Sequence, residues 1–170
     1  NTWKGWKYTQ AVIDQYKDDD SKLFLSVGNH ATHADEKNIK YVGHVDSKAE
    51  LALYYSAADA LLFTSIAENF PLVLLEAMSC GLPIISFDVG GAKESVTHME
   101  NGFIAPYLNT DKLKEGMDWL FGLSDGEREA ISERSVSKVR TCYDIAHMTE
   151  RYIALYKELY EKRDPQPKGN

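Results

Sequence analysis

The sequence from Glu68 to Glu76 reads ENFPLVLLE, and it joins a short apolar run to a helix. The apolar run, Asp59–Ser65, is typical of a buried parallel strand. Asn69 is suited to cap the helix, and Pro71 fits its first turn, where the missing N–H costs nothing. Gly81-Leu82-Pro83 then ends the helix. The order is therefore strand, polar turn and helix, and ligands of open α/β sheets bind beyond the carboxyl ends of the strands.

The two glutamates have different expected positions. Glu68 lies in the loop before the helix, whereas Glu76 lies about 7–8 Å into it at 1.5 Å per residue. The N–H groups of Phe70, Leu72 and Val73 are expected to point out of the helix start and to favour an anion. A ligand with a phosphate and several hydroxyls would suit this arrangement. Taken alone, however, the pair favours the plainer interpretation of a solvated Glu68 and a surface Glu76.

Length and composition exclude several classes of protein. A chain of 170 residues with 44% hydrophobic residues predicts one domain with a real core. The formal net charge of −7 argues against nucleic acid and anionic lipid as partners. No apolar run approaches the roughly 20 residues of a membrane span, and no signal-peptide pattern is present. Cys80 and Cys142 are too few for a disulfide framework, so a reducing cytosol is the default compartment.

Strands alternate with helices through most of the chain, which predicts a parallel, doubly wound sheet. Strands are expected at Lys22–Asn29, Ile39–Val45, Asp59–Ser65, Pro83–Asp88 and Gly102–Pro106. Helices are expected from Thr2 to Lys17, from Ser47 to Ala58, from Pro71 to Gly81, in a short turn near Glu94, and at Asp111–Leu123, Asp125–Arg140 and Ile145–Lys162. No strand precedes the first helix, so the first strand of the domain is expected upstream.

The last of these helices carries an apolar stripe at three- and four-residue spacing, made of Met148, Tyr152, Leu155, Tyr156 and Leu159. Such a stripe must cover another surface. We expect it to pack on the sheet of the same domain; contact with a neighbour outside the chain is the alternative.

Two further motifs have both a functional and a structural interpretation. His30, His33 and Asp35 could bind a metal, but no fourth ligand lies nearby, so a polar loop is favoured. Gly90-Gly91 either allows a ligand to approach the backbone or only forms a turn. It lacks the third spaced glycine of a dinucleotide-binding fingerprint.

The residues from Tyr41 to Pro106 resemble the C-terminal, donor-binding half of the retaining glycosyltransferases of the two-domain GT-B type, family 4 (glycosyl transferases group 1). The hallmark of that family is two glutamates separated by seven residues, here Glu68 and Glu76. The flanking pieces that match in order are Lys4-Gly5, Val27-Gly28, Val42–Val45, Ala57–Asp59, Gly90-Gly91 with Glu94, and Asn101–Phe103. The resemblance spans nearly the whole chain.

The resemblance implies a Rossmann-like, three-layer α/β/α domain over residues 1–163 and a tail over residues 164–170. It also implies an N-terminal acceptor domain that this chain lacks. Enzymes of this kind transfer a sugar from a nucleoside-diphosphate sugar to an acceptor hydroxyl and retain the anomeric configuration. The acceptor, a saccharide or a lipid-linked saccharide, would be held by the missing domain. The setting implied is polysaccharide or glycoconjugate biosynthesis in the cytoplasm, with peripheral association of the full-length protein at the inner face of the membrane.

The resemblance also implies roles for single residues. Glu68 would be the catalytic residue at the donor sugar, Glu76 would bind the ribose hydroxyls, and Lys4 would neutralise the leaving diphosphate. The other binding positions implied are Gly28, Asn29, Gly43, His44, Val45, Ser65, Asn69, Phe70, Pro71, Leu72 and Val73. Neither a cofactor nor a bound metal is implied, since the nucleoside-diphosphate sugar is the donor substrate.

Two departures from the family pattern matter. Residue 71 is often glycine in the family, and Pro71 removes one N–H donor from the set expected to hold the sugar. The arginine partner of Lys4 should lie upstream of the chain. Without an acceptor domain, the chain alone is expected to be inactive in transfer. A nucleotide-sugar epimerase-like domain and a non-catalytic interaction domain of the same fold are the alternatives.

Overall fold

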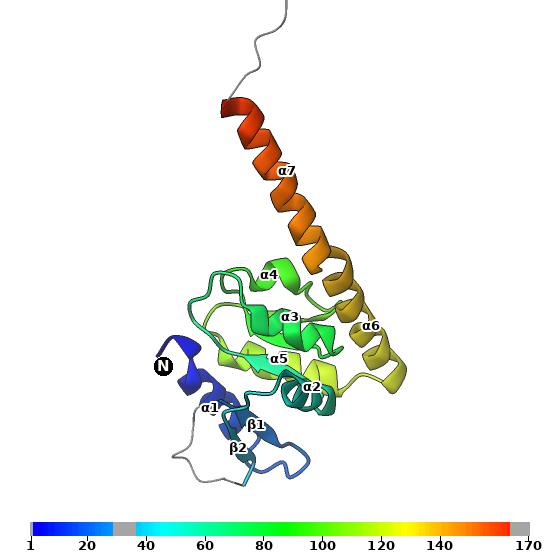
Figure 1. Ribbon diagram of the computed structural model, residues 1–170. Helices are drawn as coiled ribbons and strands as arrows, with labels where there is room; N and C mark the ends of the chain where they lie inside the picture. The colour runs from blue at the N-terminus through cyan, green and yellow to red at the C-terminus, as the bar shows by residue number, and fades with distance from the viewer. Residues whose placement is uncertain (1, 29–36, 164–170) are drawn as a thin grey trace, which may run out of the picture.

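The computed structural model describes residues 2–28 and 37–163 (Figure 1). In chain order its elements are η1 (Thr2–Lys4), α1 (Trp6–Asp14), β1 (Phe24–Val27), β2 (Ile39–Gly43), α2 (Lys48–Ala57), β3 (Leu61–Phe63), α3 (Leu72–Ser79), β4 (Ile84–Phe87), α4 (Ala92–Ser95), β5 (Gly102–Ala105), α5 (Thr110–Phe121), α6 (Asp125–Cys142) and α7 (Ile145–Arg163). The expected strands are present but shorter at their ends, and the three long C-terminal helices lie close to their expected bounds.

The strands pair in parallel, as the alternation of elements predicts. β4 lies between β3 and β5, and Ile84 pairs with Leu61 on one side and with Gly102 on the other. β1 pairs with β2, Phe24 opposite Ile39, in a separate two-stranded sheet. The parallel α/β class is thus confirmed, although strand pairing divides the expected single sheet into two.

Helix α1 and the turn that follows it connect the two sheets through aromatic side chains. Tyr16 packs against Phe24 of β1, with ring centroids 6.1 Å apart. Tyr8 meets Phe87 of β4 edge-on at 5.5 Å. Since Tyr16 is also part of the main core cluster, the two-stranded sheet is joined to the rest of the domain by packing on the turn after α1 rather than by strand pairing.

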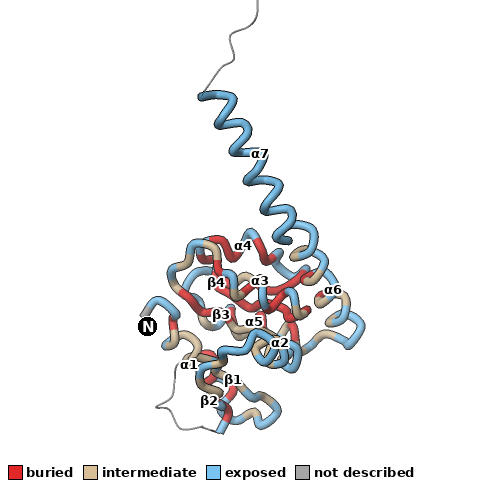
Figure 2. Tube along the Cα trace, in the orientation of Figure 1, coloured by how far each residue is buried: buried red, intermediate tan, exposed pale blue. Residues whose placement is uncertain are grey.

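The core is centred on β4, whose residues are all buried (Figure 2). A strand that is covered on both faces usually has a nearly continuous apolar sequence, and Ile84-Ile85-Ser86-Phe87 has one. Leu74 and Met78 of α3 are fully buried, as are Leu113 and Leu120 of α5. α3 also packs along α6, so β4 and α3 form the centre from which the loops at the carboxyl ends of the strands project.

Two expected helix starts are wrong, and both differences arise from tertiary contacts. The first helix does not run from Thr2 to Lys17, because Gly5 adopts a left-handed φ of 68° between η1 and α1. Asn69 does not cap α3. Pro71 is its N-cap, with extended backbone and no side-chain cap hydrogen bond. The carbonyl of Asn69 instead accepts a hydrogen bond from the N–H of Gly91 at 2.7 Å.

Helix α7 projects from the body of the domain, and every residue in it is exposed (Figures 1 and 2). Its apolar side chains reach the solvent, including Tyr156, which is 64% exposed, and Met148, which is 50% exposed. The expectation that this stripe packs on the sheet of its own domain is therefore wrong. Within residues 2–28 and 37–163, no helix has both the length and the apolar character needed to cross a membrane.

Candidate functional site

The segment that precedes α1 is held against the end of β3. The N–H of Ile66 donates to the carbonyl of Trp3 at 2.9 Å, and the hydroxyl of Thr64 donates to the carbonyl of Lys4 at 3.3 Å. Gly5 allows this approach, since a Cβ at that position would lie 1.9 Å from the carbonyl oxygen of Thr64. These contacts place Lys4 at the carboxyl end of β3.

Lys4 and Glu68 form an ion pair in which Nζ lies 2.6 Å from Oε1. The Glu68 side chain is only 17% exposed, whereas that of Lys4 is 60% exposed. A carboxylate that is largely removed from water needs a charged or hydrogen-bonding partner, and Lys4 supplies one. Glu68 is therefore not the solvated loop residue that the glutamate pair alone favours. The fold has brought together two candidates that lie 64 residues apart.

The turn that contains Glu68 packs directly on the Gly90-Gly91 turn. We refer to residues 68–71 as the glutamate turn and to residues 89–94 as the glycine turn. Gly90 has a φ of 49°, and a Cβ there would lie 2.0 Å from the carbonyl oxygen of Glu68. A Cβ at Gly91 would lie 2.6 Å from the Phe70 ring. Gly90 and Gly91 thus allow the protein's own glutamate turn to approach closely.

The start of α3 follows the glutamate turn immediately. Leu72 and Val73 occupy its first turn, where N–H groups have no acceptor within the helix. Pro71 provides no side-chain cap, and Leu72 is 65% exposed. Ser65, by contrast, is buried. The partial positive charge of the helix start therefore lies directly after the glutamate turn in the chain.

Glu76 lies one turn further along α3 and is exposed. The Tyr55 hydroxyl of α2 donates a hydrogen bond to its Oε2 at 3.4 Å. Burial, followed by the charge of Glu76 and this hydrogen bond, raises the pKa of Tyr55 to about 12. The Tyr55 hydroxyl therefore stays protonated at neutral pH and remains a donor to the carboxylate.

Another set of candidates lies at the carboxyl ends of β1 and β2, and comprises Gly28, Gly43, His44 and Val45. The N–H of Gly28 donates to the carbonyl of Gly43 at 2.7 Å, which holds the two strand ends together. Trp6, beside Gly5, packs against Tyr41 of β2 at 6.1 Å. This contact connects the set to the segment that carries Lys4.

Not every sequence candidate contributes in the same way. His44 Nε2 lies 3.0 Å from an Asp46 carboxylate oxygen in an exposed pair. Asn29 lies outside the described residues, and so do His30, His33 and Asp35, the residues considered for a metal.

The structure also shows two tyrosines next to the candidate site that the sequence interpretation missed. Tyr107 follows β5, and its hydroxyl donates to the carbonyl of Ile66 at 2.8 Å. Tyr143 follows α6; its ring packs against Phe70 and its hydroxyl donates to the carbonyl of Glu94. Neither tyrosine belongs to a sequence motif. No signal in the sequence could have predicted their positions, because each hydroxyl donates a hydrogen bond to a backbone carbonyl of a distant segment.

Comparison with known proteins finds relatives of this chain in both sequence and fold. The uncharacterized glycosyltransferase of Haemophilus influenzae is 27% identical over 157 residues, covering 81% of this chain and 44% of that protein. Sucrose-phosphate synthase from Thermosynechococcus elongatus superposes with a TM-score of 0.81 at 23% identity, covering 95% of this chain and 44% of that one. Anabaena HepE in complex with UDP and glucose gives a TM-score of 0.74 at 21% identity, covering 92% of this chain and 45% of that one.

The chain spans less than half the length of these relatives. The model of the family described as glycosyl transferases group 1 matches residues 27–137, which is more than half of the chain and includes both glutamates. This chain therefore belongs to the glycosyl transferases group 1 family.

Proposed function

We propose that this chain is the donor-binding half of a retaining, metal-independent GT-B glycosyltransferase of family 4. It would bind a nucleoside-diphosphate sugar and present it for transfer to an acceptor hydroxyl with retained anomeric configuration. The observation that carries the proposal is the ion pair of Lys4 and Glu68 at the carboxyl end of β3. This pair would supply a cation for phosphate and a carboxylate for sugar hydroxyls beside an uncapped helix start. The complex of Anabaena HepE, which has a similar fold, with UDP and glucose supports this choice of ligand.

The proposed division of roles is the one that the family resemblance implies. The diphosphate would be held by Lys4 and by the N–H groups of residues 70, 72 and 73, while Glu68 contacts the donor sugar. Glu76, exposed on α3, would bind the ribose hydroxyls. Pro71 contributes no N–H, so one fewer donor is available than with glycine at this position.

Binding of the diphosphate would require an exchange of partners at Lys4. Without ligand, its ammonium group contacts Glu68 at 2.6 Å. A diphosphate carries more charge than a carboxylate and would compete for the same ammonium group. Glu68 would then be released toward the sugar. Negative charge that develops on the leaving diphosphate would be stabilised by Lys4, which is the main way such a site lowers the barrier.

The remaining parts of the proposal concern the whole protein. Residues 1–163 would form the donor domain and residues 164–170 a tail. A further domain would bind a saccharide or lipid-linked acceptor in polysaccharide or glycoconjugate biosynthesis, at the cytosolic face of a membrane. Residues 1–170 alone would bind nucleotide but transfer negligible sugar, because the acceptor would have no binding site.

The test is a calorimetric titration of the chain with UDP, GDP, ADP and CMP, and then with the corresponding nucleotide sugars. We expect one base to bind. Lys4→Ala should lower the affinity for the nucleoside diphosphate of that base far more than the affinity for its nucleoside, since the substitution removes only a phosphate contact. Glu76→Ala should lower the affinities for the nucleoside diphosphate and for the nucleoside by a similar factor, since both ligands contain the ribose.

The matched control is Lys112→Ala, which removes a lysine from another ion pair of the same 2.6 Å length within α5. It should leave nucleotide affinity unchanged. If no nucleotide binds the parent chain, the chain is instead a non-catalytic interaction domain of this fold. If Glu76→Ala leaves nucleoside affinity unchanged, the ribose role of Glu76 is wrong.

A further inference from the structure

Tyr143 contacts both turns of the candidate site from the end of α6. Its ring centroid lies 5.5 Å from that of Phe70 in the glutamate turn. Its hydroxyl donates to the carbonyl of Glu94, at the end of the glycine turn, at 2.8 Å. Burial raises the pKa of Tyr143, so this hydroxyl stays protonated and remains a donor at neutral pH. One side chain thus bridges two segments that are separated in sequence by α3 and β4.

Helix α6 brings Tyr143 to this place by packing along α3. Near the end of α3, a Cβ at Gly81 would lie 2.2 Å from the Ser132 hydroxyl of α6. At the opposite end, Phe70 precedes α3 and meets Tyr143, which follows α6. The length of α6 therefore spans α3 and ends at the glutamate turn.

The two turns also contact each other, through the hydrogen bond from the Gly91 N–H to the Asn69 carbonyl. Tyr143 closes a ring of contacts around that hydrogen bond, with Phe70 next to the acceptor and Glu94 three residues beyond the donor. We propose that Tyr143 is a positioning residue that holds the glutamate turn and the glycine turn in the arrangement needed for donor binding. The inference rests on the proposed function for its ligand, but the contact between the turns can be measured without ligand.

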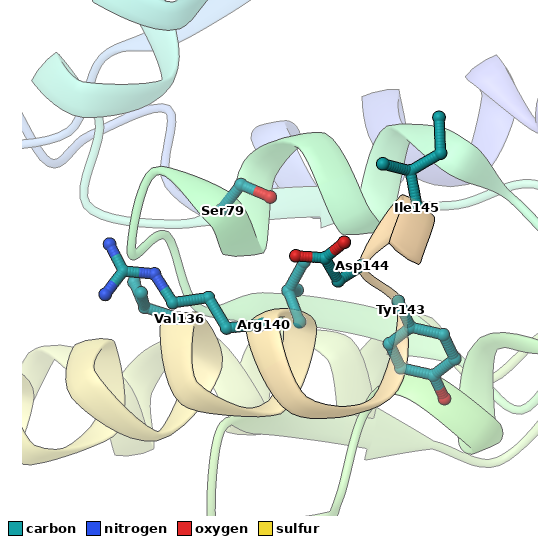
Figure 3. A pocket seen from close by; sticks show the side chains of 7 residues that line it. Ser79, Val136, Arg140, Tyr143, Asp144 and Ile145 are labelled. Atoms are coloured by element: carbon teal, nitrogen blue, oxygen red, sulfur yellow. The ribbon is translucent and has the colours of Figure 1, made fainter. Parts of the chain in front are cut away.

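Tyr143 also lies beside a pocket at the contact between α6 and α3. Tyr143, Asp144 and Ile145 line an open pocket of about 360 Å³ on the side facing α3, together with Ser79, Val136, Val139 and Arg140 (Figure 3).

Tyr143→Phe and Tyr143→Ala separate the two contacts. The phenylalanine variant keeps the ring against Phe70 and loses the hydrogen bond to Glu94, whereas the alanine variant loses both. Tyr160→Ala is the matched control, since Tyr160 lies on α7 and is 72% exposed. The first measurement is the hydrogen-exchange rate of the Gly91 amide in the ligand-free chain, with the Ile85 amide of β4 as the reference for global opening.

We expect Gly91 exchange to accelerate about fivefold in Tyr143→Phe, the factor that corresponds to one neutral hydrogen bond, and further in Tyr143→Ala. Exchange at Ile85 should change much less, and Tyr160→Ala should affect neither amide. The affinity for UDP, or for the base that the titrations select, should fall in the same order, because the turns would have to be ordered during binding.

The proposal is overturned if Gly91 exchange in Tyr143→Ala matches that in Tyr160→Ala. It is also overturned if Gly91 and Ile85 accelerate by the same factor, since that would show a loss of global stability rather than of positioning. If the parent chain binds no nucleotide, the proposed function fails, and the ratio of the two exchange rates still decides whether Tyr143 holds the turns together.

Discussion

Replacing Gly90 with alanine tests the close packing of the glutamate turn on the glycine turn. The backbone at Gly90 has a φ of 49°, which costs an alanine about 1 kcal/mol or more. The new Cβ would lie 2.0 Å from the carbonyl oxygen of Glu68, so the backbone must shift. We expect that shift to break the hydrogen bond from Gly91 to Asn69, at a cost of about 1 kcal/mol. The total loss should be about 2–3 kcal/mol, which lowers Tm by roughly 5–10 °C in a chain of this size.

Alanine variants of two other glycines distinguish the backbone cost in Gly90→Ala from the cost of the close contact. Gly43 has a φ of 81°, but a Cβ added there would meet no other atom within 4 Å, so Gly43→Ala should cost about 1 kcal/mol from the backbone alone. Gly126 lies in the first turn of α6, with no neighbour within 4 Å and no left-handed φ. Gly126→Ala should stabilise the protein by up to about 1 kcal/mol, because alanine is the better helix former.

The assay is urea unfolding followed by far-ultraviolet circular dichroism, with the midpoint and the slope compared across the three variants. A lower midpoint with an unchanged slope would report a loss of stability in the folded state. If Gly90→Ala is no more destabilising than Gly43→Ala, the contact with Glu68 is not tight, and the account of the two turns as a packed unit is wrong.

Three other outcomes are expected. Burial and a hydrogen bond to Asp118 raise the pKa of Tyr16, so its stabilisation is present below its ordinary pKa of 10.0 and is lost as the pH rises above it. Tyr16→Phe should therefore flatten the alkaline limb of a stability-versus-pH curve. Leu74→Ala, which truncates a fully buried side chain of α3, should cost about 3–5 kcal/mol in urea unfolding. Amides of α7 should exchange with solvent much faster than those of β4, since no α7 residue is buried; equal protection would contradict this.

Local patterns in the sequence are sufficient to predict most of the elements. Ser47 is predicted to start α2, and its hydroxyl does accept the Glu50 N–H. The apolar run at Ile84–Phe87 is predicted to be a buried strand, and it is the centre of the core. Such predictions succeed because caps, turns and apolar periodicity depend on neighbours within a few residues.

The same reasoning fails where a distant segment competes with a local preference. Asn69 has the side chain of a good helix cap, but its turn is held by a backbone hydrogen bond from Gly91, and Pro71 becomes the N-cap. The apolar spacing of α7 is typical of a packed helix, yet no part of the described domain covers it. Spacing reports that a face is apolar and carries no information about which surface meets it.

The order of strand, turn and helix around the two glutamates, and the family of the chain, follow from residues near one another in sequence. The ion pair of Lys4 with Glu68, the contact of Gly90 with that turn and the bridge made by Tyr143 exist only in the folded chain. Each joins segments that are held in place by the burial of apolar surface in the core of the domain. Because that burial is non-directional, local sequence cannot specify which polar groups it brings within hydrogen-bonding distance.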